Sequence, residues 1–265
     1  MKKTASLLVS AALTGALLAP AALAAGAPAA ELSLNGTPLD TSALPAVEGI
    51  PMRLVTEADK GYASWFQDED QGFFYLAGRR IVVDFRDGSV SVDDEALEGV
   101  TATVEAGVTF LPVSVLDHLD GVSAVEKDGR LEISTPNGTP LAKLAYAVAE
   151  AGGVAIGSNA TPEDLDDYGI HSDSFTQMWS FFPMMTSPDT VLIGKLADGR
   201  EAQARADLEE YRQQQEDTFS WYLSQNLPKV QEAQTVVQDG WLLFVIGEDA
   251  DAAVQTFRDG VAGLE

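Results

Sequence analysis

The side chains best suited to catalysis are scarce or scattered in this 265-residue sequence. It contains no cysteine and two histidines, His118 and His171, which stand far apart in the chain. A transition-metal site needs several imidazole or thiolate ligands close together, and a hydrolytic serine needs a base within reach. No Gly-x-Ser-x-Gly elbow and no phosphate-binding glycine loop occurs in the sequence. We therefore expect no metal, no cofactor and no nucleophilic catalysis.

Carboxylates are the one abundant chemical group, with 41 aspartates and glutamates. The acidic runs at residues 68–70, 93–95 and 163–167 lack the EF-hand spacing, so we interpret them as solvated loops. A glycosidase-type pair is defined by a separation that exists only in the fold. A small envelope hydrolase using two carboxylates is therefore the alternative to a non-enzymatic role. A pair such as Asp166 and Glu232 would have to converge in one deep pocket.

The charge balance excludes some partners. Against 41 acidic residues stand 16 basic ones, a formal net charge of −25. Such a surface repels phosphate backbones, so nucleic-acid binding is not expected, and docking on anionic lipid is disfavoured. After the N-terminal segment, no apolar run reaches the roughly 18 residues that span a bilayer. We expect no integral membrane segment in the mature chain.

The N-terminal segment has the pattern of an export signal. Two lysines precede a short apolar run, and a small-x-small motif ends at Ala24. This pattern predicts a signal peptide over residues 1–24, cleavage between Ala24 and Ala25, and a linker over residues 25–31. The mature protein is expected to be secreted or otherwise extracytoplasmic, with association at the cell surface as one form of that location.

Short alternating apolar runs separated by turn residues begin after the linker, a pattern typical of antiparallel strands. Brief helices are expected at residues 51–60 and 112–120, each starting at a proline. Strands are expected at residues 72–77, 80–85, 89–92 and 131–134, and hairpin turns at Asn35-Gly36, Asp87-Gly88 and Asp128-Gly129.

The two expected helices belong to an internal near-repeat. The first copy has Pro51, Arg53, Glu57, Gly61 and Trp65, whereas the second has Pro112, Ser114, Asp117, Gly121 and Val125. On this motif, residues 32–136 resemble the copper amine oxidase N-terminal-like, or stalk, domain of exported bacterial proteins. The resemblance implies a small antiparallel sheet on short helices that serves as a surface module, without copper amine oxidase activity. Both glycines are expected as left-handed helix caps, and Trp65 as a buried anchor.

A turn cluster at residues 137–140 separates this part from a second one. There the periodicity predicts helices at residues 141–151, 199–225 and 249–261, and strands at residues 174–185, 190–196, 234–238 and 241–246. The order of these elements, with residues 191–195, 211–219 and 240–246, resembles the exported domain-of-unknown-function family 4358 over residues 140–262. That family implies no established activity.

Two surfaces of the second part concern function. In the strand around Trp179, Phe181 and Phe182, neighbouring side chains point to opposite faces. Usually a helix covers the second face; the alternative is an exposed aromatic platform for a ligand or partner. The opposite charges on one face of the long helix are expected to be solvated; these are Glu201, Arg205, Glu209, Arg212 and Glu216.

Together these patterns predict an α+β protein of two small domains, residues 32–136 and 140–265, each a mainly antiparallel sheet packed with helices. The expected function is a non-enzymatic binding or spacer role at the cell envelope or in secretion. Its partner would be a cell-wall component, a peptide or another envelope protein. A third possibility is an extracytoplasmic sensor that captures a small ligand between the two modules.

Overall fold

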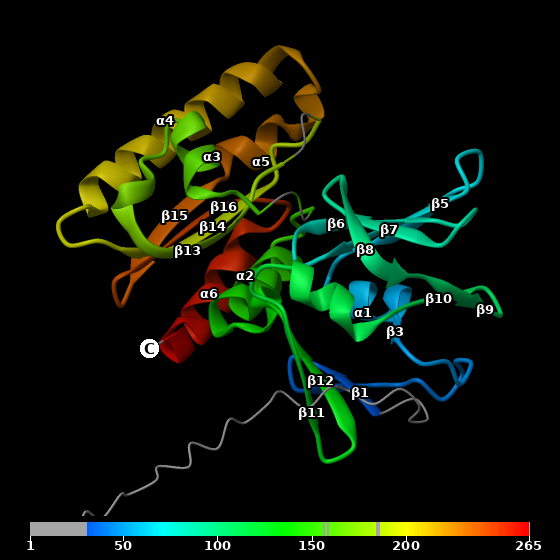
Figure 1. Cartoon of the computed structure of the whole chain (residues 1–265). Coiled ribbons are helices and arrows are strands. Elements are labelled where there is room, and N and C mark those ends of the chain that lie inside the picture. The colour runs from blue at the N-terminus through cyan, green and yellow to red at the C-terminus, as the bar shows by residue number, and fades with distance from the viewer. Residues whose placement is uncertain (1–30, 156, 158, 184–185, 265) are drawn as a thin grey trace, which may run out of the picture.

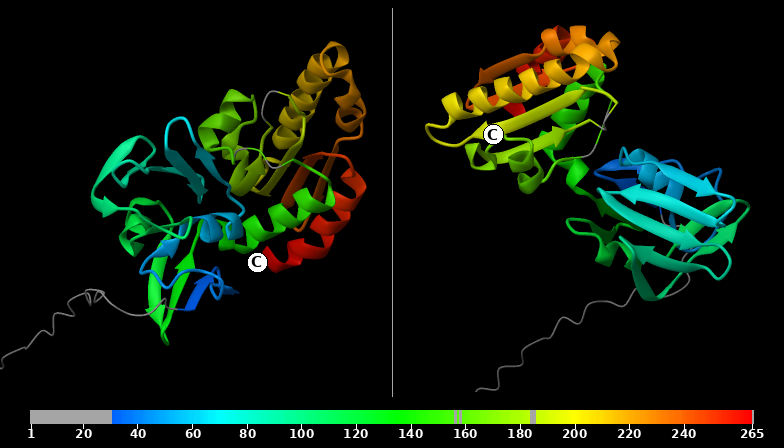
Figure 2. Two further views of the ribbon diagram at one scale, coloured as in Figure 1. Left: turned by 90° about the vertical axis from the view of Figure 1, so that its right-hand side faces the viewer. Right: turned by 90° about the horizontal axis from the view of Figure 1, so that it is seen from above.

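The computed structural model describes residues 31–155, 157, 159–183 and 186–264. The expected signal peptide, with its cleavage between Ala24 and Ala25, lies outside the described residues. The chain is an α+β protein, as expected, and its sheets are mainly antiparallel (Figure 1, Figure 2). Among the described strands, β1 and β12 form the parallel pair.

The N-terminal part contains three sheets, with strand orders β11-β12-β1-β2, β3-β10-β9 and β4-β5-β6-β7-β8. Its elements are β1 (Glu31–Leu34), β2 (Thr37–Leu39), β3 (Ile50–Pro51), α1 (Met52–Ala58), β4 (Ala63–Phe66), β5 (Gln71–Leu76), β6 (Arg79–Asp84), β7 (Ser89–Val92), β8 (Glu95–Thr101), β9 (Thr103–Glu105), β10 (Val108–Leu111), the 3₁₀ helix η1 (Val113–His118), β11 (Ser123–Lys127) and β12 (Arg130–Ser134).

One apolar core holds these elements together. Alternate residues of β5 and β6, such as Phe74 and Ile81, face α1, where Met52 and Val55 are buried. The predicted strands and hairpins are confirmed. The sequence analysis missed β8, β9 and β10. The strands β8 and β9 are largely exposed and carry glutamate, so their apolar signal is weak, and β10 has only four residues.

The near-repeat folds differently in its two copies. Pro51 precedes α1, whereas Pro112 precedes a 3₁₀ helix. Gly121 adopts the expected positive φ of 72°. The expected cap at Gly61 is wrong, because Lys60 takes the left-handed conformation instead. Gly61 is needed for a close approach, since a Cβ there would lie 1.7 Å from the Tyr75 carbonyl oxygen.

The C-terminal part is built on one sheet with strand order β13-β14-β16-β15. Its elements are η2 (Pro136–Gly138), α2 (Pro140–Ala151), α3 (Pro162–Asp167), η3 (Ser172–Ser174), β13 (Phe175–Phe181), β14 (Thr190–Leu196), α4 (Glu201–Trp221), η4 (Ser224–Asn226), α5 (Leu227–Gln231), β15 (Gln234–Gln238), β16 (Trp241–Ile246), α6 (Ala250–Gly260) and η5 (Val261–Leu264).

Helices cover both faces of this sheet (Figure 1). Trp241, Leu243 and Val245 of β16 join the core under α2 and α6, while the intervening residues join the core under α4. Burial on both faces explains why β16 is an unbroken apolar run. The apolar stripe of α4 lies on the sheet as predicted, except that the helix ends at Trp221 and Tyr222 is exposed.

A buried aspartate ties the two parts together. Asp59, at the end of α1, accepts hydrogen bonds from Asn35 Nδ2 at 3.3 Å, from the Ala77 N–H at 3.2 Å and from the Thr135 hydroxyl. Asn137 Nδ2 donates to the Asp59 carbonyl oxygen at 2.7 Å and to its carboxylate at 3.0 Å. Burial raises the pKa of the Asp59 carboxyl, and these hydrogen bonds oppose the rise. The predicted boundary is therefore a hydrogen-bonded junction.

The first prediction concerns this junction. Replacing Asp59 by alanine removes the acceptor of the Thr135 hydroxyl and of the Ala77 N–H, while Asn35 Nδ2 keeps Thr135 Oγ1 at 2.9 Å, so the free energy of unfolding should fall by about 2–3 kcal/mol. Urea unfolding followed by circular dichroism measures the loss. Asp68→Ala, in an exposed turn, is the control and should change stability by less than about 0.5 kcal/mol. Equal effects of the two variants would contradict the assigned role of Asp59.

The second prediction concerns alkaline pH. Burial, with a contribution from the nearby Asp59 charge, raises the pKa of Tyr146 to about 12 from the ordinary value of 10.0. Between these values the folded chain holds a proton that the unfolded chain has released, so stability falls as pH rises through this window. Tyr146→Phe should lose less stability than wild type between pH 9 and pH 11.5 in urea unfolding. Parallel losses in the two proteins would count against this account.

Candidate ligand-binding cleft

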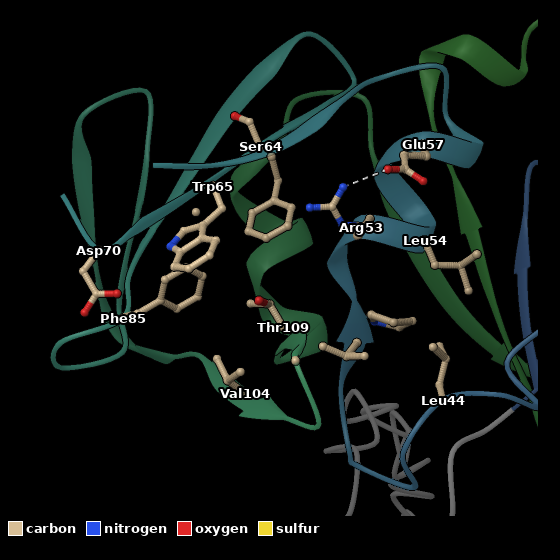
Figure 3. Close-up of a pocket in the computed structure, with 15 residues that line it drawn as sticks. Leu44, Arg53, Leu54, Glu57, Ser64, Trp65, Asp70, Phe85, Val104 and Thr109 are labelled. Carbon is tan, nitrogen blue, oxygen red and sulfur yellow. Dashed lines mark hydrogen bonds and ion pairs between the residues drawn. The ribbon is translucent and has the colours of Figure 1, made fainter. Parts of the chain in front are cut away.

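A cleft of about 700 Å³ opens in the N-terminal part (Figure 3). It lies between α1, the β4–β5 hairpin and the β9–β10 hairpin. Its walls are mostly apolar, with three aromatic rings among the lining residues: Trp65, Phe74 and Phe85. Val104 of β9 and Leu54 of α1 also line the cleft, with Leu54 at the end away from Trp65 and Phe85 (Figure 3).

The cleft exists because one row of residues on the inner face of the sheet, Trp65, Gly72 and Val83 on neighbouring strands, is not fully covered by other side chains. Trp65 pairs across the strands with Gly72, and Gly72 with the buried Val83, so Trp65 points to the core-facing side of the sheet. A Cβ on Gly72 would lie 2.7 Å from Phe85 Cζ, so the glycine gives space to the Phe85 ring. Trp65 remains 59% exposed. The expectation that Trp65 is buried is wrong, since it stands on the edge strand, at the end of its row.

Polar groups lie at the rim of the cleft. Arg53 Nη1 forms an ion pair with Glu57 Oε1 at 3.2 Å and donates to the Ala63 carbonyl oxygen at 3.4 Å, which ties α1 to β4. The Asp70 carbonyl oxygen accepts the Phe85 N–H at 2.9 Å. Asp70 lines the same part of the cleft as Trp65 and Phe85 (Figure 3). An apolar pocket with a few polar groups is the usual form of a small-ligand site.

The aromatic segment singled out from the sequence is largely internal. Phe181 is 1% exposed and packs against Tyr146 of α2, with ring centroids 4.9 Å apart. Phe182 is 2% exposed and stacks on Tyr168 at 4.7 Å. Trp179 is partly buried on the same face as Phe181. The exposed aromatic platform is therefore not formed, because helices cover both faces of this sheet.

The other sequence candidates do not meet in a cavity. Asp166 accepts hydrogen bonds from the Ser172 N–H at 2.8 Å and hydroxyl at 3.0 Å, which lower its pKa below the ordinary value. Glu232 is exposed after α5, and neither carboxylate lines the cavities found among the described residues. His171 Nδ1 lies 3.0 Å from Asp207 Oδ2. Within the described ranges, no three histidines, cysteines or carboxylates form a group able to hold a metal ion.

Comparison with known proteins supports one of the two resemblances. The family model "Domain of unknown function (DUF4358)" matches residues 161–247, inside the range expected for it. No curated protein and no solved structure matches this sequence. The likeness of residues 32–136 to a copper amine oxidase N-terminal-like domain is not supported by these comparisons and stays a prediction. Across the described part of the chain, every helix lacks the length or the apolarity needed to span a bilayer.

Sequence reasoning missed this cleft, although one signal for it was present. An isolated glycine inside a strand often marks close approach of another group, and Gly72 stands inside β5. Its neighbour across the sheet is the exposed tryptophan. The sequence alone does not reveal this combination, because Gly72 and Trp65 become neighbours only when β4 and β5 pair in the correct register.

The third prediction uses two tryptophans to test this geometry. Trp65→Ala should cost only about 1–2 kcal/mol of unfolding free energy, because more than half of the residue is already exposed. Trp241→Ala, at a side chain that is 3% exposed, should cost about 3–5 kcal/mol. Urea unfolding of both variants provides the comparison. A cost of several kcal/mol for Trp65→Ala would mean that the ring is packed in solution and the cleft is closed.

Proposed function

We propose that this protein is a non-catalytic ligand-binding module of an exported bacterial protein, and that the cleft around Trp65 is its binding site. The observation that carries the proposal is a tryptophan on the core-facing side of a sheet that is left 59% exposed at a cleft of about 700 Å³. The predicted leader and the stalk-like motif of residues 32–136 support an extracytoplasmic location.

The physical reason is the unused apolar surface. A large ring held in a concave, mostly apolar site gains favourable contact area when a ligand displaces its water. A volume of about 700 Å³ lies in the usual range of roughly 300–1,000 Å³ for ligand pockets. An exposed aromatic ring in such a site is typical of an interaction surface.

The walls of the cleft are held in place before a ligand arrives. Arg53 joins α1 to the Ala63 carbonyl oxygen of β4, and the Phe85 N–H joins its strand end to Asp70. Pre-organised walls lower the entropy cost of binding. An extracytoplasmic sensor would also bind its ligand in this cleft, and would differ from a simple binding module only in passing on a signal when the ligand is bound.

A carboxylate-pair hydrolase is the second candidate, because Glu57 and Asp70 both line the cleft. Glu57 is engaged by Arg53 at 3.2 Å, which favours a structural part for this carboxylate. The two functions differ in one readout: a hydrolase releases new reducing ends or peptide products from its ligand, whereas a binding module returns the ligand unchanged.

The fourth prediction tests the site with purified protein starting at Ala25. Soluble disaccharide-peptide wall fragments, a basic peptide and an acidic peptide are added separately, and thermal unfolding is followed. A ligand at about 100 times its Kd should stabilise the protein by about 2.7 kcal/mol. Trp65→Ala should abolish that stabilisation.

Trp221→Ala is the matched control, since Trp221 is 80% exposed at the end of α4, away from the cleft. It should leave the stabilisation unchanged. Stabilisation that survives Trp65→Ala, or its absence with every ligand, would refute the proposed site. Cleavage of the wall fragments that depends on Glu57 and Asp70 would replace binding by hydrolysis.

A further inference from the structure

We propose that the ligand of this cleft is an extended peptide, which adds to the outer edge of β4 and places a basic side chain against Trp65, Phe85 and Asp70. The inference rests on the proposed binding function and names its class of ligand. Three observations carry it: an open strand edge, a cleft on one side of that edge, and a carboxylate that lines this cleft together with aromatic rings.

The open edge belongs to β4, which stands at the end of the sheet order β4-β5-β6-β7-β8. The Tyr75 N–H donates to the Tyr62 carbonyl oxygen at 3.0 Å. In an antiparallel pair the direction of backbone groups alternates, so the N–H and C=O groups of Ala63 and Trp65 point away from β5. Arg53 confirms this direction by donating to the Ala63 carbonyl oxygen from outside the sheet. At Trp65 the edge is open to another strand.

A peptide strand beside β4 would send alternate side chains to opposite faces of the sheet. Those on the core-facing side would enter the cleft next to Trp65, and the others would remain near solvent. Main-chain pairing then supplies affinity, and the cleft supplies selectivity for one side chain. The apolar lining from Leu54 and Val104 suits the stem of a long side chain.

The charge expected on the ligand's side chain follows from the charged residues that line the cleft. Arg53 is engaged by Glu57, and Arg86, which lies near Asp70, is engaged by Asp84. Among the described charged residues that line the cleft, Asp70 is the one without a salt bridge. It lines the cleft together with the Trp65 and Phe85 rings (Figure 3). Aromatic faces with a carboxylate attract lysine or arginine, and the net charge of −25 favours the same sign of partner.

The experiment is calorimetric titration of the whole mature chain with the peptide acetyl-Ala-Val-Lys-Val-Ala-amide. Two probes are compared with it: the same peptide with norleucine in place of lysine, and the lysine peptide with alternate backbone nitrogens methylated. We expect the norleucine peptide to bind at least fivefold more weakly. The methylated peptide should bind at least tenfold more weakly, because it loses donors to the β4 edge.

Asp70→Asn tests the charge without disturbing the backbone, because asparagine accepts the positive φ of 54° at this position. This variant should bind the lysine peptide at least fivefold more weakly and lose the preference over norleucine. Asp239→Asn is the matched control, an aspartate with φ of 54° in the β15–β16 turn. It should bind as wild type does.

The outcomes separate this inference from the function on which it rests. Equal binding of the lysine and norleucine peptides, no binding of either, or no effect of backbone methylation overturns the inference. A neutral N-acetylglucosamine oligomer that binds in a Trp65-dependent way would identify a glycan site, so the binding function would stand without the peptide. If Trp65→Ala changes the binding of no probe, the proposed function fails as well.

Discussion

The arrangement of the molecule depends on a buried carboxylate that is held by neutral donors. Burial favours the protonated form of Asp59 and raises its pKa, and the hydrogen bonds from Asn35, Thr135, Asn137 and the Ala77 N–H offset part of that cost. These donors come from the β1–β2 turn, the end of β12, the junction and the β5–β6 turn. One side chain thus fixes the end of α1 against four other segments, including the start of the C-terminal part.

The cleft follows from that fixed helix. α1 has seven residues, Met52–Ala58, so it covers only part of the sheet's inner face. The row that contains Trp65 and Gly72 extends beyond it, and there the Phe85 ring occupies the place of the missing glycine side chain. A longer helix, or a larger residue at position 72, would fill the same space. The site is therefore a consequence of how far the core extends, and the β4–β5 and β9–β10 turns complete its walls.

Sequence periodicity predicted the C-terminal part well, because each of its main elements is long and carries a strong apolar pattern. β16 is apolar at every position and buried on both faces, and α4 carries its stripe toward it. Other features depend on tertiary coverage, which periodicity does not contain. Phe182 is internal because Tyr168 and Tyr211 cover it, whereas Trp65 is exposed because nothing covers the edge of its sheet in the described structure. The capping box at Thr161 and Asp164 was a local signal for α3 that was not used.

Several aromatic residues of the C-terminal part pack in its core, whereas some of those in the N-terminal part line the cleft. The helix α1 lies between this cleft and the junction of the two parts. In the C-terminal part, Phe182, Tyr211 and Phe244 pack edge-to-face in the core under α4. In the N-terminal part, the ring of Trp65 faces the cleft, whose wall includes Arg53 and Glu57. Glu57 stands two positions before Asp59 on a helix whose end is hydrogen-bonded to Asn137. The seven-residue helix that carries Arg53 and Glu57 on the cleft wall is therefore followed directly by the aspartate that binds the junction, so the cleft and the junction share one short element.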